Sequence, residues 1–260
     1  MQYDLANGDV TIDQDEHKGA YSYQGEDKEN NRTYVNEDEK DDGKIIINGD
    51  KDTPTSNTVT VQEDVKKTNK DDGSEGRDVD IVIDGVKADT SETGKSTVTV
   101  GEGADVDLTV KDSTLTTGGN GIDIGKDLDG TDENKDTKVD LTLEDTTINQ
   151  TNKNSAGLDV RQGSDVDLTL KGDNTIDGSQ ATGDKNVSDN TNVEGIRVGG
   201  EVASDSSDAE KDAHLTIKGD TSSKEEAAAE DTTEGSETSG DTTENDKTSG
   251  GSLTIKDTTT

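Results

Sequence analysis

Short runs of alternating aliphatic and polar residues recur along the chain, and they predict β-strands. The fullest copies read VDLTVKDSTL at 106–115, VDLTLEDTTI at 139–148 and VDLTLKGDNTI at 166–176. Shorter copies stand at 44–50 (KIIINGD), 79–86 (VDIVIDGV), 214–220 (HLTIKGD) and 252–257 (SLTIKD). Successive side chains of a strand point to opposite faces, so the aliphatic positions of each copy share one buried face.

A second phrase follows the best copies, and it predicts another inward-facing strand. It reads GIDIG at 121–125, GLDV at 157–160 and GIRV at 195–198, and TVTV runs at 58–61 and 97–100 hold the same place earlier. Between the two phrases, Ile148 and Ile176 offer one further inward contact. Repeats of this kind indicate stacked units that bury a shared core.

The pattern therefore predicts an all-β fold, a right-handed parallel β-helix (solenoid) of about six three-strand coils. The expected coils begin near Lys44, Val79, Val106, Val139, Val166 and Ala213, with a seventh starting at Ser252. Glycines before the third strand (Gly121, Gly157 and Gly195) are expected at tight corners with positive φ, and Gly172 is expected in a bulge.

Four segments are expected. Residues 1–43, which hold all four tyrosines, form an N-terminal cap that protects the first coil edge. Residues 44–219 form the coils, interrupted by acidic polar loops. Residues 220–250 are an acidic low-complexity insertion expected to be disordered. Residues 251–260 look like the start of a further coil that is cut short.

Composition narrows the function classes. The chain has 260 residues, a net charge of −36, 23% hydrophobic residues and no Phe, Trp or Cys. This acidity argues against nucleic-acid partners, because phosphate binding needs clustered Lys and Arg. No stretch is long and apolar enough to insert in a membrane, and the segment MQYDLANGDVTID has no signal-peptide pattern. The acidity also suits a high-salt habitat.

Stacking predicts a column of carboxylates on the outer face. Asp107, Asp140 and Asp167 occupy equivalent positions about 4.8 Å apart, where neighbouring carboxylates repel by roughly 1 kcal/mol in water. Beside them runs an expected threonine column, formed by Thr109, Thr142, Thr169, Thr216 and Thr254. Two interpretations of the acidic column stay open, a solvated charged face and a set of calcium ligands.

The loop DLDGTDENKD at 127–136 is a second candidate for calcium. It brings Asp127, Asp129 and Asp132 close together, although it lacks EF-hand spacing. GGNGIDI at 118–124 fits one copy of a calcium-binding nonapeptide, a motif that acts in tandem, and it also fits a simple corner.

Other chemistry is less well supported. Tyr21 and Tyr23 are read either as part of the cap or as a platform that stacks on a glycan. A polysaccharide lyase or hydrolase is a further alternative. Only Arg161 and Arg197 lie in or beside the coil strands to bind an acidic polymer, and no carboxylate pair stands out.

Several phrases resemble a known family. YDLANGDVTID, TVTVGEGADVDLTVKDSTL and GLDVRQGSDVDLTLKGDNTIDG are similar to secreted bacterial proteins described as carbohydrate-binding domain-containing or β-helical, adhesin-like surface proteins. The resemblance covers roughly residues 1–219. It implies a right-handed parallel β-helix exported to the cell surface, and it carries over no functional residue.

The sequence as a whole favours a non-catalytic extracellular structural or adhesive module of a bacterial surface protein, stabilised by calcium. Its partner would be a glycan or a host or cell-surface protein. The alternatives are a specific glycan-binding module, a polysaccharide-cleaving enzyme, and a filament subunit. In the last, the final coil of one copy would pair head to tail with the strand around Val10 to Ile12 of the next.

Overall fold

The protein is all-β, with most of its strands arranged in three parallel sheets. The computed structural model describes residues 2–15, 20–25, 32–34, 44–65, 79–130, 135–181, 194–199, 212–220 and 251–256. Within these ranges there is no α-helix; the one helical element is a 3-10 turn, η1 (Leu5–Asn7). No helix in this part of the chain has the length and apolar character needed to cross a membrane.

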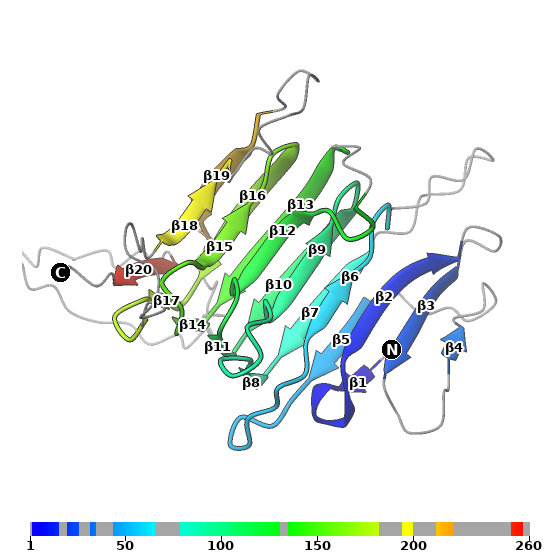
Figure 1. Cartoon of the computed structure of the whole chain (residues 1–260), viewed down its shortest axis with the longest axis horizontal. Coiled ribbons are helices and arrows are strands. Elements are labelled where there is room, and N and C mark those ends of the chain that lie inside the picture. Colours follow the sequence, from blue (N-terminus) through cyan, green and yellow to red (C-terminus); the bar gives the residue numbers. More distant parts are fainter. Residues whose placement is uncertain are drawn as a thin grey trace, which may run out of the picture.

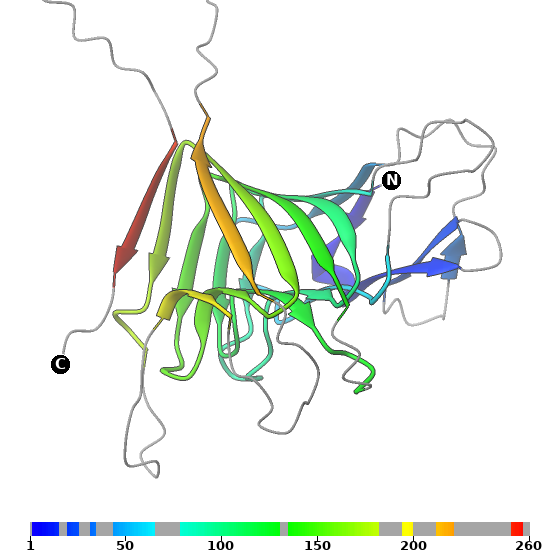
Figure 2. The ribbon, with the colours of Figure 1, turned by 90° about the horizontal axis from the view of Figure 1, so that it is seen from above.

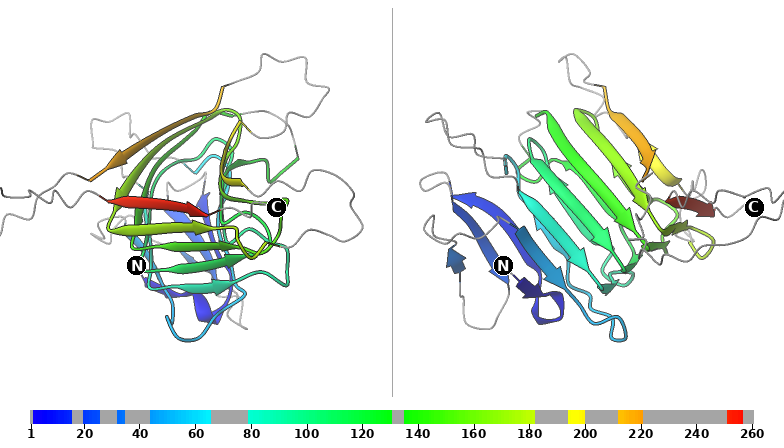
Figure 3. Two further views of the ribbon diagram at one scale, coloured as in Figure 1. Left: turned by 90° about the vertical axis from the view of Figure 1, so that its left-hand side faces the viewer. Right: turned by 180° about the vertical axis from the view of Figure 1, so that it is seen from behind.

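The three sheets lie around one interior, as the end view in Figure 3 (left) shows. In spatial order, the first sheet contains β1 (Gln2–Asp4), β5 (Lys44–Asn48), β7 (Asp80–Asp84), β10 (Asp105–Lys111), β13 (Thr137–Glu144), β16 (Ser164–Lys171) and β19 (His214–Gly219). The second contains β8 (Lys87–Asp89), β11 (Thr114–Thr117), β14 (Thr147–Gln150), β17 (Asp173–Asp177) and β20 (Ser252–Lys256). The third contains β4 (Arg32–Tyr34), β3 (Ala20–Gly25), β2 (Val10–Asp15), β6 (Val59–Val61), β9 (Val98–Gly101), β12 (Ile122–Lys126), β15 (Ala156–Val160) and β18 (Glu194–Val198).

From β7 onward the chain visits the sheets in a fixed order, which sets neighbouring repeats side by side (Figure 1). We call one passage through the first, second and third sheets a round; β7–β8–β9, β10–β11–β12, β13–β14–β15 and β16–β17–β18 are four complete rounds. The alternation read from the sequence is confirmed, because β10 buries every second residue. β10, β13 and β16 pair in register, so that Leu108, Leu141 and Leu168 form one column.

The interior is a continuous aliphatic core contributed by all three sheets. Leu108 from the first sheet, Leu115 from the second and Ile122 from the third are fully buried. The predicted second contact is confirmed by the column Leu115–Ile148–Ile176. Because every round adds aliphatic side chains to the same core, neighbouring rounds stabilise one another.

Corners between the first and second sheets repeat one backbone conformation. Asp112 and Asp145 have φ of 50° and 47°, and Gly172 takes their place in the next round with φ of 60°. The residues after Asp112 and Asp145, which are Ser113 and Thr146, are polar and buried. There, Ser113 accepts a hydrogen bond from the N–H of Val86 in the preceding round. Such side chains satisfy backbone donors that the turn leaves without a strand partner.

The prediction that Gly121, Gly157 and Gly195 adopt positive φ was wrong. None of them is among the residues with positive φ. Their role is steric, because a Cβ on Gly121 would lie 2.4 Å from Cγ2 of Ile148, and one on Gly157 would lie 2.3 Å from Cγ2 of Ile176. Glycine at these positions leaves room for the isoleucine of the next strand of the second sheet.

Two predicted alignments near the C-terminal end of the sheets were also wrong. β19 pairs so that Thr216 lies beside Asp167 and Lys218 beside Thr169, which removes Thr216 from the threonine column. β20 joins the second sheet, where Thr254 pairs with Thr175. Ser252–Lys256 therefore does not start another round in the first sheet. It follows β19 as the second-sheet strand of the round that β19 begins.

The opposite end of the third sheet is extended by antiparallel strands. β2 pairs with β6 on one edge and with β3 on the other, and β4 follows β3. The strand around Val10 to Ile12 therefore has no open edge for a neighbouring molecule. Leu5 is 1% exposed and closes the core at this end.

Candidate functional site

The outer face of the first sheet carries the acidic column that the sequence predicted. Asp107 pairs in register with Asp140, and Asp140 with Asp167. The structure adds Asp80, which pairs with Asp107. Four carboxylates thus follow one line across β7, β10, β13 and β16. The part of the threonine column formed by Thr109, Thr142 and Thr169 lies beside them.

Two further columns on this face mix acidic and basic residues, one directly beside the carboxylates and one beyond the threonine column. One contains Asp105, Lys138, Asp165 and His214, and the other contains Asp84, Lys111, Glu144 and Lys171. In the second of these, Nζ of Lys111 lies 3.0 Å from Oδ2 of Asp84, and this hydrogen bond raises the pKa of Lys111. Lysines beside the acidic column offset part of its self-repulsion.

Two open hollows lie on this face, and only the first touches the acidic column. One, of about 130 Å³, is lined by Asp105, Lys138, Val139, Asp140, Asp165 and Asp167. The other, of about 370 Å³, shares Lys138 and Asp165 and reaches Asp212 and His214. Their mixed charges resemble the rest of this face.

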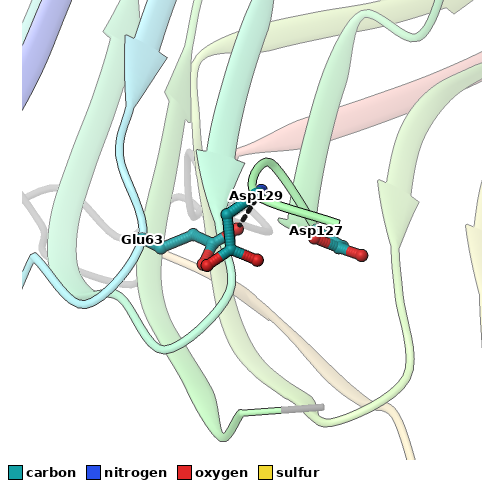
Figure 4. A group of neighbouring side chains, drawn as sticks. All are labelled: Glu63, Asp127 and Asp129. Carbon is teal, nitrogen blue, oxygen red and sulfur yellow. Dashed lines mark hydrogen bonds between the residues drawn. The ribbon is translucent and has the colours of Figure 1, made fainter. Parts of the chain in front are cut away.

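A second acidic group is formed by loops on another part of the molecule. Glu63, Asp127 and Asp129 bring three carboxylate oxygens within 4.8 Å of one another (Figure 4). Oε1 of Glu63 accepts hydrogen bonds from the backbone N–H of Leu128 and, at 2.9 Å, from that of Asp129. Glu63, which follows β6, thus holds the turn after β12 in place.

This acidic group already has a cationic neighbour. Nζ of Lys135 lies 2.9 Å from Oδ2 of Asp64 and 3.3 Å from Oε2 of Glu63. Hydrogen bonds to these two carboxylates raise the pKa of Lys135 well above its usual value. Burial, and then the negative charges of Asp127 and Glu63, raise the pKa of nearby Glu102. Any added cation therefore competes with a lysine for Glu63.

A third set of carboxylates lies on the outer side of the third sheet, where it is buried. Asp123 and Asp159 pair in register on β12 and β15, and they are 3% and 1% exposed. The guanidinium of Arg161 donates to both oxygens of Asp123, at 2.7 and 3.0 Å. That of Arg197 donates to both oxygens of Asp159, and Nδ2 of Asn120 adds a bond of 2.9 Å.

The ion pairs shift the guanidinium pKa values upward. Burial favours the neutral form of Arg161, yet the hydrogen bonds and charge of Asp123 raise its pKa overall. The hydrogen bond to Asp159 raises the pKa of Arg197. Bidentate pairs of this kind hold both partners in a fixed geometry. The two arginines considered for binding an acidic polymer are thus engaged within the fold.

The structure brings together some of the predicted site residues. Asp107, Asp140 and Asp167 line up, and Asp127 and Asp129 meet, whereas Asp132 lies outside the described residues. Tyr21 and Tyr23 lie in β3, where their backbone pairs with Gln14 and Ile12. Their side chains, like the segment expected to be disordered between Asp220 and Gly251, also lie outside the described part.

Sequence reasoning missed Glu63, Asp80 and the buried carboxylates. Glu63 stands two residues after TVTV but reaches a loop 65 residues away, and no local motif signals that contact. Asp123 and Asp159 stand in the same alternating pattern as the exposed acids. The paired arginines at Arg161 and Arg197 were the available signal.

Comparisons with protein-family models, curated proteins and solved structures give no match.

Proposed function

We propose that the chain is a right-handed parallel β-helix of about six coils that serves as a non-catalytic structural or adhesive module of a bacterial surface protein. The matched registers of the four complete rounds support the β-helix. Right-handed connection of parallel strands is strongly preferred, which supports its hand. The resemblance to exported β-helical proteins supports the location.

The observation that carries a non-catalytic role is the engagement of Arg161 and Arg197 with Asp123 and Asp159. Cleavage of an acidic polymer requires cations that face the substrate, and these guanidinium groups are held by buried carboxylates of their own sheet. The outer face of the first sheet instead presents a regular acidic surface. Such a surface suits a stiff, well-solvated spacer that positions loops for neutral glycans or basic proteins.

The proposal includes calcium as a stabilising ion at Glu63, Asp127 and Asp129. Calcium prefers six to eight oxygen ligands, so three carboxylates with water would form a weak site. The convergence of their oxygens within 4.8 Å supports this location over the acidic column. Lys135 opposes it, since calcium would have to displace or share its contact with Glu63.

The first test compares circular dichroism melts in millimolar calcium with melts in sodium chloride of equal ionic strength. We expect calcium alone to raise the melting temperature of the wild type and of Asp140→Asn, but not of Asp129→Asn. Loss of the effect in Asp140→Asn instead would assign the ion to the acidic column. An equal rise in sodium chloride would show general screening and remove calcium from the proposal.

The second test concerns catalysis. The chain is incubated with uronate-containing and neutral polysaccharides, and new reducing ends are measured. We expect no release above that from a heat-denatured sample. Reproducible release by the folded chain, absent from the denatured control, would replace the structural role with an enzymatic one.

A further inference from the structure

The last strands of the three sheets share one end of the molecule. β18, β19 and β20 are the final strands of the third, first and second sheets. In the described part of the chain, no strand pairs with their outer edges. Figure 3 (left) looks onto this end, which we call the terminal face. Unpaired strand edges present backbone donors and acceptors to another chain.

The terminal face is also apolar. Val198, Ile217 and Ile255 are 44%, 48% and 45% exposed. Each pairs in register with a core residue of the preceding round, namely Val160, Leu168 and Ile176, which are at most 1% exposed. These three exposed side chains occupy core positions that nothing in the described residues covers. Exposed apolar groups of this kind mark interaction surfaces.

Each of the three last strands carries a cation. On each sheet, a cation of the last strand meets an aspartate of the preceding strand: Arg197 with Asp159, Lys218 with Asp167 at 3.1 Å, and Lys256 with Asp177 at 3.2 Å. The chain carries a net charge of −36, and these three pairs offset part of the negative charge at this end. Two terminal faces therefore repel each other less than two acidic side faces would.

Among the described residues, the opposite end offers a poorer match for a head-to-tail contact, with only the three-residue β1 as the edge of the first sheet. There, β3 occupies the outer edge of β2, and Leu5 is buried. A surface that lacks its complement on the same molecule can still be satisfied by an identical copy across a two-fold axis. We propose that the terminal face binds the terminal face of a second copy of this chain. β19 would then lie antiparallel to the same strand of the other copy.

The size of the terminal face sets the expected affinity. Its strands have five or six residues, so each side is about 17–20 Å long at about 3.3 Å per residue. That end face is smaller than the roughly 800 Å² per partner of a standard interface. The dimer is therefore weak and forms at high concentration. Salt strengthens it, because salt screens the repulsion between two acidic chains.

Sedimentation velocity of the full chain tests the proposal, over about 10 μM to about 1 mM, where weak dimers populate. The mass should rise from 27.4 kDa toward twice that value and stop there. Ile217→Glu should raise the dissociation constant at least about tenfold. Thr216→Glu adds the same charge to the outward face of the same strand and should change it by about twofold or less.

Hydrogen–deuterium exchange at the two ends of this concentration range locates the contact. Slower exchange at high concentration in 194–198, 214–219 and 252–256 supports the terminal face, and protection confined to another surface overturns it. A strict monomer at every concentration also overturns the proposal. So does dimerisation only after 221–250 is replaced by a short linker, because that segment would then be the occupant. Growth beyond a dimer would point to head-to-tail contacts and reject the two-fold arrangement.

Discussion

The outer faces of the first and third sheets accommodate stacked aspartates in different ways. Both place aspartates in register on neighbouring parallel strands, with aliphatic residues on either side in the sequence. On the third sheet, Asp123 and Asp159 are buried, and two arginines bind them. On the first sheet, Asp140 and its neighbours face solvent among alternating lysines and acids. Figure 2 shows the strands lying side by side along the length of the molecule.

The difference shows that burial determines how strongly a row of stacked carboxylates must be compensated by cations and hydrogen bonds. Water screens the exposed column, so like charges there cost little and surface lysines are sufficient. A buried carboxylate loses its hydration and must be compensated by a cation and hydrogen bonds in good geometry. The same alternating sequence pattern is therefore compatible with a solvent-exposed acidic surface on one sheet and with a buried ion-pair network on the other.

We expect the largest effect from a comparison of two aspartate–cation pairs, each of which joins the last strand of its sheet to the strand before it. Asp159 pairs with Arg197 and is 1% exposed, whereas Asp167 pairs with Lys218 and its side chain is 47% exposed. Asp159→Ala removes the bidentate partner of Arg197, which among the described residues keeps only its 3.4 Å contact with Glu194, and the acceptor of Asn120 Nδ2, so we expect a loss of about 3 kcal/mol of unfolding free energy. Asp167→Ala should cost less than about 1 kcal/mol.

Urea unfolding followed by far-UV circular dichroism measures both variants. The slope of free energy against urea must stay unchanged for the comparison to hold. Similar losses in the two variants would contradict the distinction between the faces.

A smaller effect tests the like-charge column itself. Asp140 lies in register with Asp107 and Asp167, and asparagine keeps its size and one acceptor oxygen while removing the charge. Lys138 offsets part of the repulsion, so Asp140→Asn should stabilise the fold by only about 0.5 kcal/mol at low ionic strength. The gain should vanish in about 1 M salt, where the Debye length is about 3 Å.

Asp159→Asn provides the contrast for this measurement. It should destabilise the fold at both salt concentrations, because a buried pair is screened much less. A salt-independent change in Asp140→Asn would mean that the column acts through specific contacts rather than through charge.

Features that depend on residues close together in the sequence were predicted correctly, and features that depend on distant residues were not. Alternation with period two correctly set the faces of β10, β13 and β16, since burial of Leu108 and its equivalents follows from local pattern. Register was harder where the pattern was short. HLTIKG pairs so that Ile217, not Leu215, lies beside Leu168. The motif LTIK alone fits either alignment.

Errors and omissions arose where the deciding contact is distant in sequence. SLTIK was assigned to the first sheet by its likeness to other first strands, yet it pairs with β17 in the second sheet. Glu63 was missed because its partner loop is 65 residues away. The glycines at Gly121 and Gly157 were assigned a backbone role, although their reason is the bulk of an isoleucine on another strand. Composition and periodicity do not reveal such packing.

In its burial, Glu102 lies between the exposed and the buried carboxylates, because it is partly buried but has no arginine partner among the described residues. Its substitution should give the smallest change in stability. Burial and then the charges of Asp127 and Glu63 raise its pKa, so the folded state disfavours its ionised form. The penalty is absent below the ordinary carboxyl pKa, where Glu102 is protonated both folded and unfolded. It grows as the pH rises from that value through the raised folded-state pKa, and then stays constant.

Glu102→Gln should therefore be more stable than the wild type at neutral pH and equally stable in acid. The amide oxygen can still accept the hydrogen bond from the N–H of Lys135. Urea unfolding at several pH values between about 3.5 and about 7 gives the difference in unfolding free energy between the two proteins. A variant less stable than the wild type at neutral pH would show that Lys135 compensates Glu102 as fully as the arginines compensate the buried aspartates. The contrast between the two faces would then depend on the presence of any nearby cation rather than on bidentate pairing.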